Sequence, residues 1–194
     1  MTNRFEQENG QKEYRAFIEE KLLKNRTILI YGTIDQTVAQ HVTEKLLYLA
    51  HESDDPVNVF INSQGGHVES GDTIFDMIRC CGVSVNVVGT GWVASAGALI
   101  YVAPPVKNRF ALPNTRFMIH QPLGGMQGSA SDLAIEAKEI VKMRKRLNNI
   151  FAEQTGQPLE QIAKDSDRNF WMGPEEAKKY GVVGKIITSV KDLS

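Results

Sequence analysis

A serine surrounded by small residues is the first candidate for chemistry in this sequence. Ser95 lies in the stretch from Gly91 to Ala98, between a strand-like run (residues 84–88) and a second apolar run (residues 98–102). A hydroxyl at the end of a buried strand is held rigidly and exposed, as a nucleophile must be. The backbone N–H groups at the start of a following helix are free to donate hydrogen bonds beside it. By itself the spacing does not define a nucleophile, since it differs from the Gly-x-Ser-x-Gly elbow and serine beside glycine is a common turn residue.

Two further turns carry a candidate base and candidate anion-stabilising groups. His120 ends an apolar run and precedes Gln-Pro, so we expect its side chain to emerge from the core at a turn. Gly65 and Gly66 have no Cβ, and an N–H group of this pair, together with that of Ala96, could stabilise a tetrahedral oxyanion. The histidines show no metal-ligand spacing, so the sequence predicts no metal site.

Alternating strand and helix patterns must position these turns. The strand patterns cover residues 27–31, 57–62 and 84–89, and the helical patterns cover residues 35–51, 70–81 and 96–102. Short connections between such elements predict an α/β fold of repeated β-α units with a largely parallel sheet. Ligands bind beyond the carboxyl ends of parallel strands, so we expect the Gly65-Gly66 turn and the Ser95 turn to meet.

A long helix of about 24 residues is predicted to end at about Gln154, with Ser129 or Ser131 as its N-cap. At about 1.5 Å per residue it would be about 36 Å long, which is long for a domain of this size. With the Gly-rich extended stretch before it (residues 121–128), it forms either a projecting arm or an ordinary surface helix. One side of this helix is expected to carry its apolar residues: Leu133, Ala137, Ile140, Val141, Leu147, Ile150 and Phe151.

The remaining segments are shorter. A short helix over residues 159–163 is followed by a polar loop (residues 165–169), a helix over residues 174–180 and a terminal strand over residues 182–187. The helix over residues 174–180 has Pro174 at its start and Gly181 just after its end. Proline at the start and glycine after the end is the arrangement typical of helices.

Composition limits the classes of function. The chain has 194 residues and a net charge of −1, which favours one domain and gives no basic surface for nucleic acid. No apolar run approaches the roughly 18–20 residues that span a bilayer, and the polar stretch over residues 1–11 lacks a secretory apolar region. We expect a mobile N-terminal tail, no membrane association, two buried thiols at Cys80 and Cys81, and a cytoplasmic protein.

Four motifs, taken in order, resemble the Clp protease proteolytic subunit (ClpP) family. They are residues Asn62–Gly66, residues Gly91–Ala98, residues Met118–Pro122 followed by Gly124 and Gly125, and residues Asp165–Phe170. The resemblance covers about Leu23 to Ile187. It implies a ClpP/crotonase-like fold, one peptidase domain over residues 1–194, a mobile axial segment at residues 1–13, and a projecting strand-helix handle at residues 121–155.

The resemblance also implies roles for individual residues. Ser95 matches the nucleophile of a serine endopeptidase and His120 matches its general base. Gly66 and Ala96 match the donors of the oxyanion hole. Extended substrate would pair with the Gly-rich strand by β-augmentation, at Gly124, Gly125 and Met126.

The partners implied by the family are large assemblies. Two stacked heptameric rings, formed by this chain alone or with a second ClpP paralogue, enclose the active sites. A hexameric Clp ATPase feeds unfolded polypeptide into the rings. The chain itself is expected to need no cofactor, because ATP is used by the partner ATPase.

Two residues depart from the family pattern. Asn169 stands at the position of the triad acid, where its carbonyl can orient His120 but cannot stabilise an imidazolium by charge. Asp165 and Asp167 could replace it only from displaced positions in the loop. Gln64 replaces the family's proline and is expected to loosen the oxyanion turn.

The sequence therefore favours a weak or conditional serine peptidase that works in a complex. One alternative is a catalytically silent structural or regulatory ring subunit, which the uncharged Asn169 favours and the retained Ser95 and His120 oppose. A second alternative is a crotonase-type acyl-CoA enzyme. Such an enzyme shares the fold and the glycine-based oxyanion site, but it has no need of Ser95 together with His120.

Overall fold

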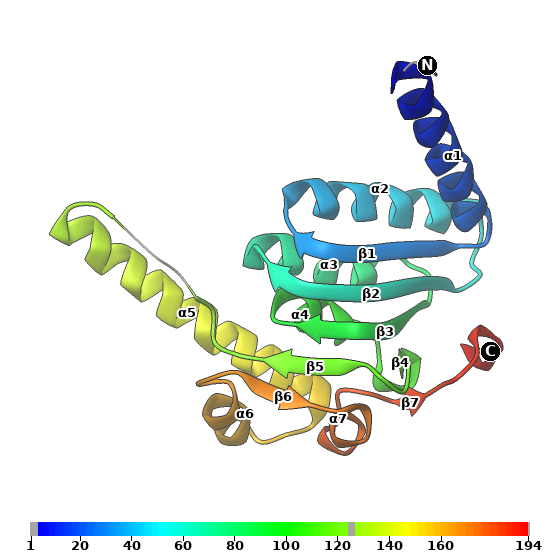
Figure 1. Cartoon of the computed structure of the whole chain (residues 1–194). Coiled ribbons are helices and arrows are strands. Elements are labelled where there is room, and N and C mark those ends of the chain that lie inside the picture. Colours follow the sequence, from blue (N-terminus) through cyan, green and yellow to red (C-terminus); the bar gives the residue numbers. More distant parts are fainter. Residues whose placement is uncertain (1–3, 124–126, 194) are drawn as a thin grey trace.

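The structure, a computed structural model, describes residues 4–123 and 127–193 (Figure 1). Within these residues a seven-stranded sheet has the order β1-β2-β3-β4-β7, and β5 pairs with both β3 and β6. All pairs are parallel except β5 with β6. The strands are β1 (Thr27–Ile34), β2 (Val57–Gly66), β3 (Val85–Ala94), β4 (Arg109–Ala111), β5 (Arg116–Ile119), β6 (Phe170–Met172) and β7 (Lys185–Ile186).

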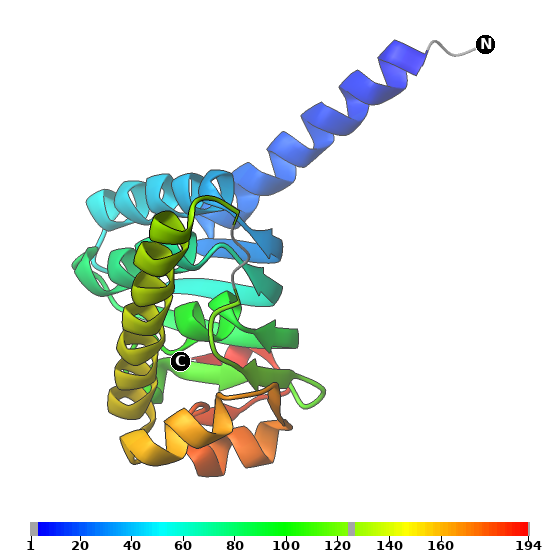
Figure 2. The ribbon, with the colours of Figure 1, turned by 90° about the vertical axis from the view of Figure 1, so that its left-hand side faces the viewer.

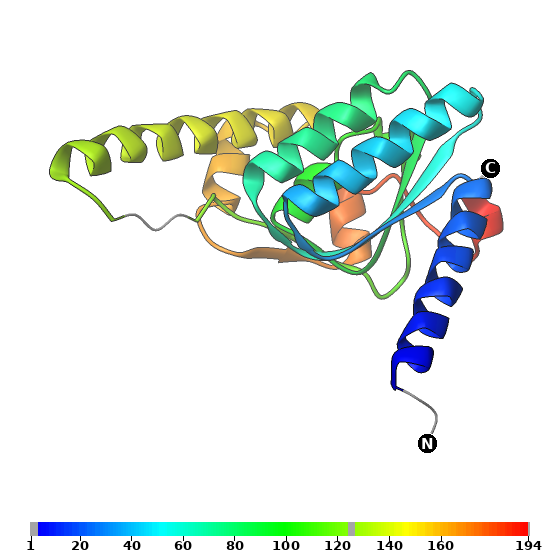
Figure 3. The ribbon, with the colours of Figure 1, turned by 90° about the horizontal axis from the view of Figure 1, so that it is seen from above.

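Three helices pack on one face of this sheet, as Figures 1 and 3 show. They are α2 (Gln36–Glu52), α3 (Val68–Cys80) and α4 (Ala96–Tyr101). The predicted start of α2 is confirmed, because the Asp35 side chain accepts a hydrogen bond from the N–H of Val38 (2.8 Å). The strand residues that face these helices, such as Ile28, Ile30, Val57, Val59 and Ile61, are fully buried and form the main core.

The central strand β3 divides its pairing between two neighbours. Its first half pairs with β4, with Val88 opposite Phe110, and its last half pairs with β5, with Val93 opposite Phe117. The carboxyl end of β3 therefore lies directly beside the carboxyl end of β5. This fork brings the residues that follow each strand, Ser95 and His120, to one place.

The long helix α5 (Ala130–Thr155) begins with a capping box formed by Ser129 and Asp132, which selects Ser129 as the N-cap. It ends at Gly156 in the left-handed conformation. Figures 1 and 3 show its first half projecting from the body of the molecule. In that half the predicted apolar side is not buried, since Leu133 and Val141 are exposed. No other part of the described chain covers it.

The N-terminal helix α1 spans Arg4–Lys24 and also projects from the body (Figure 2). Residues 4–11, predicted as a mobile tail, are therefore helical. Their Arg, Glu and Gln content has good helix propensity, which an amphipathic pattern alone does not register. That this segment is axial in an assembly stays a prediction. The thiol of Cys80 is exposed, so the expectation of two buried thiols is also wrong.

The C-terminal region closes the sheet at the lower edge in Figure 1. It contains α6 (Leu159–Asp165), α7 (Pro174–Tyr180) and a short 3₁₀ helix, η2 (Val190–Leu193). A second 3₁₀ helix, η1 (Val106–Asn108), directly precedes β4. The helix α7 matches its predicted bounds. The terminal strand is shorter than predicted, since only Lys185 and Ile186 pair, and β6 was not predicted. In the described part of the chain, no helix has the length and apolarity needed to cross a membrane.

A buried arginine joins three of these helices at their C-terminal ends. Arg109 is 1% exposed, and its guanidinium donates to the carbonyls of Val102 (2.9 Å), Gln154 (2.8 Å) and Gly181 (3.3 Å). These residues lie at the ends of α4, α5 and α7, where helix dipoles concentrate partial negative charge. Burial lowers the pKa of Arg109 to about 10, so the group stays charged at neutral pH.

Candidate active site

Ser95 occupies a sharp strand-to-helix turn between β3 and α4. Its backbone has φ 55° and ψ −121°, a conformation that non-glycine residues rarely adopt and that costs about 1–3 kcal/mol. The turn is held because the N–H of Ser95 donates to the carbonyl of Met118 on β5 (3.0 Å) and because all six residues of α4 are buried. The side chain of Ser95 is thereby presented at the carboxyl edge of the sheet.

The Gly65-Gly66 turn approaches Ser95 so closely that side chains are excluded. A Cβ on Gly65 would lie 2.6 Å from Ser95 Cβ and 3.1 Å from Ala96 N, and one on Gly66 would collide with the Ile34 carbonyl. The φ values are +98° for Gly65 and +157° for Gly66. The predicted meeting of the two turns is confirmed. The structure describes this glycine segment as the end of β2 and not as a separate turn.

His120 bridges Ser95 and Asn169. Its Nε2 lies 2.8 Å from Ser95 Oγ, and its Nδ1 lies 3.0 Å from Asn169 Oδ1. An amide oxygen can only accept, so Nδ1 carries the proton and Nε2 is free to accept the hydroxyl proton of Ser95. The unpredicted strand β6 explains the meeting, since it pairs antiparallel with β5 and sets Phe170 opposite Ile119, which places Asn169 beside His120.

The two nearby aspartates are engaged elsewhere. The Asp165 carboxylate accepts from the Tyr180 hydroxyl (2.7 Å) and from Gln161 (2.8 Å). Burial, together with the hydrogen bond to Asp165, raises the pKa of the Tyr180 hydroxyl. The Asp167 carboxylate pairs with Arg144 (3.0 Å). Neither acid contacts His120, so Asn169 is the residue that holds the imidazole.

Side chains at the base of α5 hold the loop that carries Asn169. Buried Ser166 donates to Asn148 Oδ1 on α5 (3.0 Å), and Asp167 accepts from Arg144 on the same helix. Gln121, which follows His120, donates from Nε2 to the Asp167 carbonyl (2.7 Å). Sequence reasoning missed these contacts, because residues so far apart in the chain carry no local signal of meeting.

A small apolar cavity adjoins Ser95 and His120. It has a volume of about 20 Å³, enough for about one water molecule or one methyl group. Its apolar lining comes from α3, α4, β5, α5 and the residue after Gln121: Val68, Leu99, Ile119, Pro122, Leu147 and Phe151. The site can therefore receive a small apolar group next to the serine hydroxyl.

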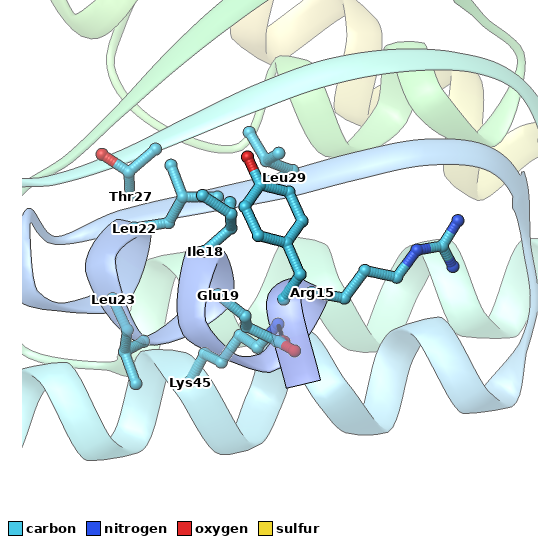
Figure 4. A pocket seen from close by; sticks show the side chains of 9 residues that line it. Arg15, Ile18, Glu19, Leu22, Leu23, Thr27, Leu29 and Lys45 are labelled. Atoms are coloured by element: carbon cyan, nitrogen blue, oxygen red, sulfur yellow. Dashed lines mark hydrogen bonds and ion pairs between the residues drawn. The ribbon is translucent and has the colours of Figure 1, made fainter. Parts of the chain in front are cut away.

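A larger hollow of about 360 Å³ lies between α1, β1 and α2 (Figure 4). Apolar side chains such as Ile18, Leu22 and Leu29 line it, and an ion pair between Glu19 and Lys45 borders it. It contains none of the candidate catalytic residues. Its apolar character instead marks a surface that α1 leaves partly uncovered.

Gly124, Gly125 and Met126, the predicted substrate-binding strand, lie outside the described residues. Among the residues that the structure describes, no group of three His, Cys, Asp or Glu side chains could hold a metal ion.

A serine hydrogen-bonded to a histidine, with the second ring nitrogen oriented by a third side chain, is the arrangement of a serine hydrolase. Comparison with known proteins identifies the family. The profile of the Clp protease family matches residues 9–190. ATP-dependent Clp protease proteolytic subunit 3 of Rhizobium meliloti (strain 1021) is 58% identical over 175 residues, which cover 90% of each chain. The proteolytic subunit 2 of Pseudomonas aeruginosa is 51% identical over 179 residues, 92% of this chain and 89% of that one.

Two solved structures agree with this assignment. ClpP1 from Listeria monocytogenes and an asparagine-to-aspartate mutant of it are each 55% identical to this chain, with TM-scores of 0.83 and 0.85. Each comparison covers 91% of this chain and 99% of the solved chain. The chain belongs to the Clp protease family and has the ClpP/crotonase-like α/β fold. It is a Clp-type proteolytic subunit, a serine endopeptidase.

Proposed function

We propose that this subunit cleaves unfolded polypeptides with Ser95 as nucleophile, His120 as general base and Asn169 as the residue that orients His120. The observation that carries the proposal is the 2.8 Å contact between Ser95 Oγ and His120 Nε2. In this mechanism Nε2 takes the hydroxyl proton as Oγ attacks the peptide carbonyl, and then gives it to the leaving amine. In the second step Nε2 takes a proton from water as the water attacks the acyl-enzyme carbonyl. It then returns this proton to Ser95 Oγ as the ester bond breaks.

The charge that develops on the carbonyl oxygen is stabilised by the N–H groups of Gly66 and Ala96. Support comes from the close approach of the glycine turn to Ser95 and Ala96. Extended substrate pairs by β-augmentation with Gly124, Gly125 and Met126, and it places one side chain in the 20 Å³ cavity. Small apolar side chains fit a cavity of this size and composition.

Activity is weak or conditional because Asn169 carries no charge. The imidazolium formed during attack on the carbonyl would be stabilised by an adjacent carboxylate, and a neutral amide offers only its dipole. Substituting asparagine for the aspartate of a serine protease triad lowers kcat by about 10⁴ in one well-known case, which is attributed to the wrong tautomer. Here the tautomer is correct, so the expected deficit is smaller.

The subunit acts in a double heptameric ring, alone or with a second ClpP paralogue, and a hexameric Clp ATPase supplies the substrate. The exposed apolar side chains on α1, β1 and α2 support assembly, because subunit contacts would bury them: Tyr14, Phe17, Leu29, Tyr31, Leu47 and Tyr48. The projecting α5 would serve as the handle between rings. The chain needs no cofactor of its own, and its location is the cytoplasm.

Labelling with a serine-directed fluorophosphonate tests the proposal. The protein is labelled alone and mixed with a standard ClpP subunit, beside Ser95→Ala and Asn169→Asp. We expect slow labelling of Ser95 alone, faster labelling in the mixture, no labelling of Ser95→Ala, and a tenfold or greater gain of peptidase activity in Asn169→Asp.

The other outcomes separate the alternatives. If Ser95 is not labelled in any mixture, the chain is a silent ring subunit. If Asn169→Asp stays inactive alone while mixed rings cleave peptides, assembly limits the activity and the missing charge does not. Hydrolysis of acyl-CoA thioesters without peptide cleavage would support the crotonase-type alternative.

A further inference from the structure

The end of β2 loses its regular pairing on both sides before it reaches the nucleophile. Toward β1, Tyr31 pairs with Asn62 and Thr33 with Gly65, so two residues of β2 face one residue of β1. Toward β3, the register shifts between Ile61 and Ser63. A bulge of this kind leaves backbone groups without ladder partners, and something else must hold the Gly65-Gly66 turn in place.

Consecutive side chains of β2 replace the missing ladder bonds. Asn62 Oδ1 accepts from the N–H of Trp92 on β3 (3.4 Å). Buried Ser63 donates its hydroxyl to the Gly32 carbonyl on β1 (2.5 Å) and accepts from the N–H of Gly65 (3.0 Å). The first glycine of the turn is therefore tied to β1 through a side chain.

Gln64 makes the third and outermost tie. When its amide oxygen faces Thr33, it accepts from Thr33 Oγ1 (2.6 Å) and from Thr33 N (3.2 Å), and its amide nitrogen donates to the Gly32 carbonyl (3.3 Å). The carboxamide thus pairs with β1 as a peptide group of a neighbouring strand would. The sequence predicted that Gln64 loosens this turn, and the contacts instead give it an anchor.

We propose that Gln64 is a positioning residue for the oxyanion turn and that it acts through Thr33. The inference rests on the proposed function, because the turn matters for catalysis only if Gly66 donates to the oxyanion. Gln64 touches neither Ser95 nor His120 in the structure. It fixes the register of Gly65 and Gly66 relative to β1, and hence their distance from Ser95.

Thr33 and Gln64 lie where they can be substituted without disturbing other parts of the protein. Thr33 and Gln64 are both exposed, so their substitution leaves the core intact. Gln64→Met keeps the length of the side chain and removes its hydrogen bonds. Thr33→Val keeps the branched shape without the hydroxyl, and Thr33→Ser keeps the hydroxyl. Gln40→Met, on the exposed surface of α2 where Gln40 bonds only Glu44, is the matched control.

The experiment measures the rate of Ser95 labelling by a fluorophosphonate and the kcat and KM for a peptide, all in the assembled protein. We expect Gln64→Met and Thr33→Val each to lower the labelling rate and kcat about two- to tenfold, with KM changed less than twofold. The double variant should lose little more than Gln64→Met alone, because Gln64→Met already removes the contact with the Thr33 hydroxyl. Thr33→Ser and Gln40→Met should match the wild type.

Hydrogen–deuterium exchange of residues 63–67 gives a second readout that does not need activity. We expect several-fold faster exchange in Gln64→Met and Thr33→Val and no change in Thr33→Ser. Unchanged exchange, or a kcat that falls equally in Thr33→Ser, overturns the inference. If wild-type Ser95 is never labelled, the proposed peptidase function fails, and the exchange rates still decide whether Gln64 holds the turn.

Discussion

The two halves of the candidate site are built in different ways. Ser95 follows a buried parallel strand, and the Gly65-Gly66 turn packs against it where no side chain fits, with its ties to β1 made inside the sheet. His120 and Asn169 sit at the ends of a short antiparallel pair. The loop that carries Asn169 is held by side-chain hydrogen bonds to α5, at the base of the projecting helix, and Gln121, which follows His120, bonds this loop.

This difference shows where the activity of the site can vary. A nucleophile that is held by buried strands cannot move without disturbing the core. A base whose orientation depends on a few polar contacts to an arm can be misaligned when the arm is displaced. Substitutions around Ser95, in the nucleophile half, should therefore cause large losses of activity. Substitutions around His120 and Asn169, in the base half, should cause smaller, graded losses.

The largest expected effect tests the nucleophile half. Gly65→Ala would put a Cβ 2.6 Å from Ser95 Cβ, in a backbone conformation that alanine adopts with strain. We expect a loss of about 100- to 1000-fold in the rate of Ser95 labelling, similar to the loss of an oxyanion donor. Gly173→Ala, where a Cβ meets nothing within 4 Å, is the control and should label normally. Normal labelling of Gly65→Ala would show that this half is not rigid.

The next effect concerns the residue that joins the two halves. Arg109 bonds the end of α4, which follows Ser95, and the end of α5, which supports Asn169. Arg109→Met leaves these buried carbonyls without a donor, so we expect a loss of about 3 kcal/mol in the free energy of unfolding. Calorimetry should show a Tm lower by about 6–12 °C.

Arg116→Met provides the comparison for Arg109→Met. The guanidinium of exposed Arg116 lies over the ring of Trp171 (4.3 Å), and its loss should cost less than about 1 kcal/mol. Equal destabilisation by the two substitutions would contradict the role assigned to Arg109.

A smaller effect tests the base half. Asn148→Leu removes the acceptor of the Ser166 hydroxyl, and Ser166→Ala removes its donor. We expect each to lower kcat about three- to tenfold with little change in KM, because the loop that carries Asn169 loosens. In a double-mutant cycle the two effects should not add. Additive losses would mean that the hydrogen bond is not what couples α5 to the site.

The smallest effect tests the cavity that both halves share. Phe151→Leu enlarges the 20 Å³ space beside Ser95. We expect the ratio of kcat/KM for peptides with leucine rather than alanine at the cleaved position to rise about three- to tenfold. Leu159→Ala, an exposed position on α6, should leave the ratio unchanged. A constant ratio in Phe151→Leu would place the recognised side chain elsewhere.

The sequence predicted the elements whose signals are local. Caps and end residues located α2 from Asp35 and α7 from Pro174 and Gly181, because a cap depends on residues three or four positions apart. Ser95, His120 and the glycine turn were found because each follows an apolar run in a β-α repeat. Asn169 was found only through the resemblance to a family.

The features that the sequence did not predict depend on distant partners. Strand β6 has three residues and exists because β5 lies beside it, so no pattern within it could indicate a strand. The contacts from Asn148 to Ser166 and from Arg109 to three helix ends join residues from separate elements. The first half of α5 reads as amphipathic, and only the three-dimensional structure shows that this part of the chain has no core to cover.

In mechanical terms α5 is a lever. The contacts of Asn148 act as its fulcrum, about 27 Å from the tip at Ala130 and about 9 Å from Gln154, where the helix bonds Arg109. A sideways displacement of about 3 Å at the tip would then become an opposite shift of about 1 Å at the buried end. A shift of that size is enough to misalign a catalytic hydrogen bond. A partner that held the tip of α5 would therefore act, at threefold reduced amplitude, on the buried end of the helix, where Arg109 joins it to the end of α4, the helix that follows Ser95.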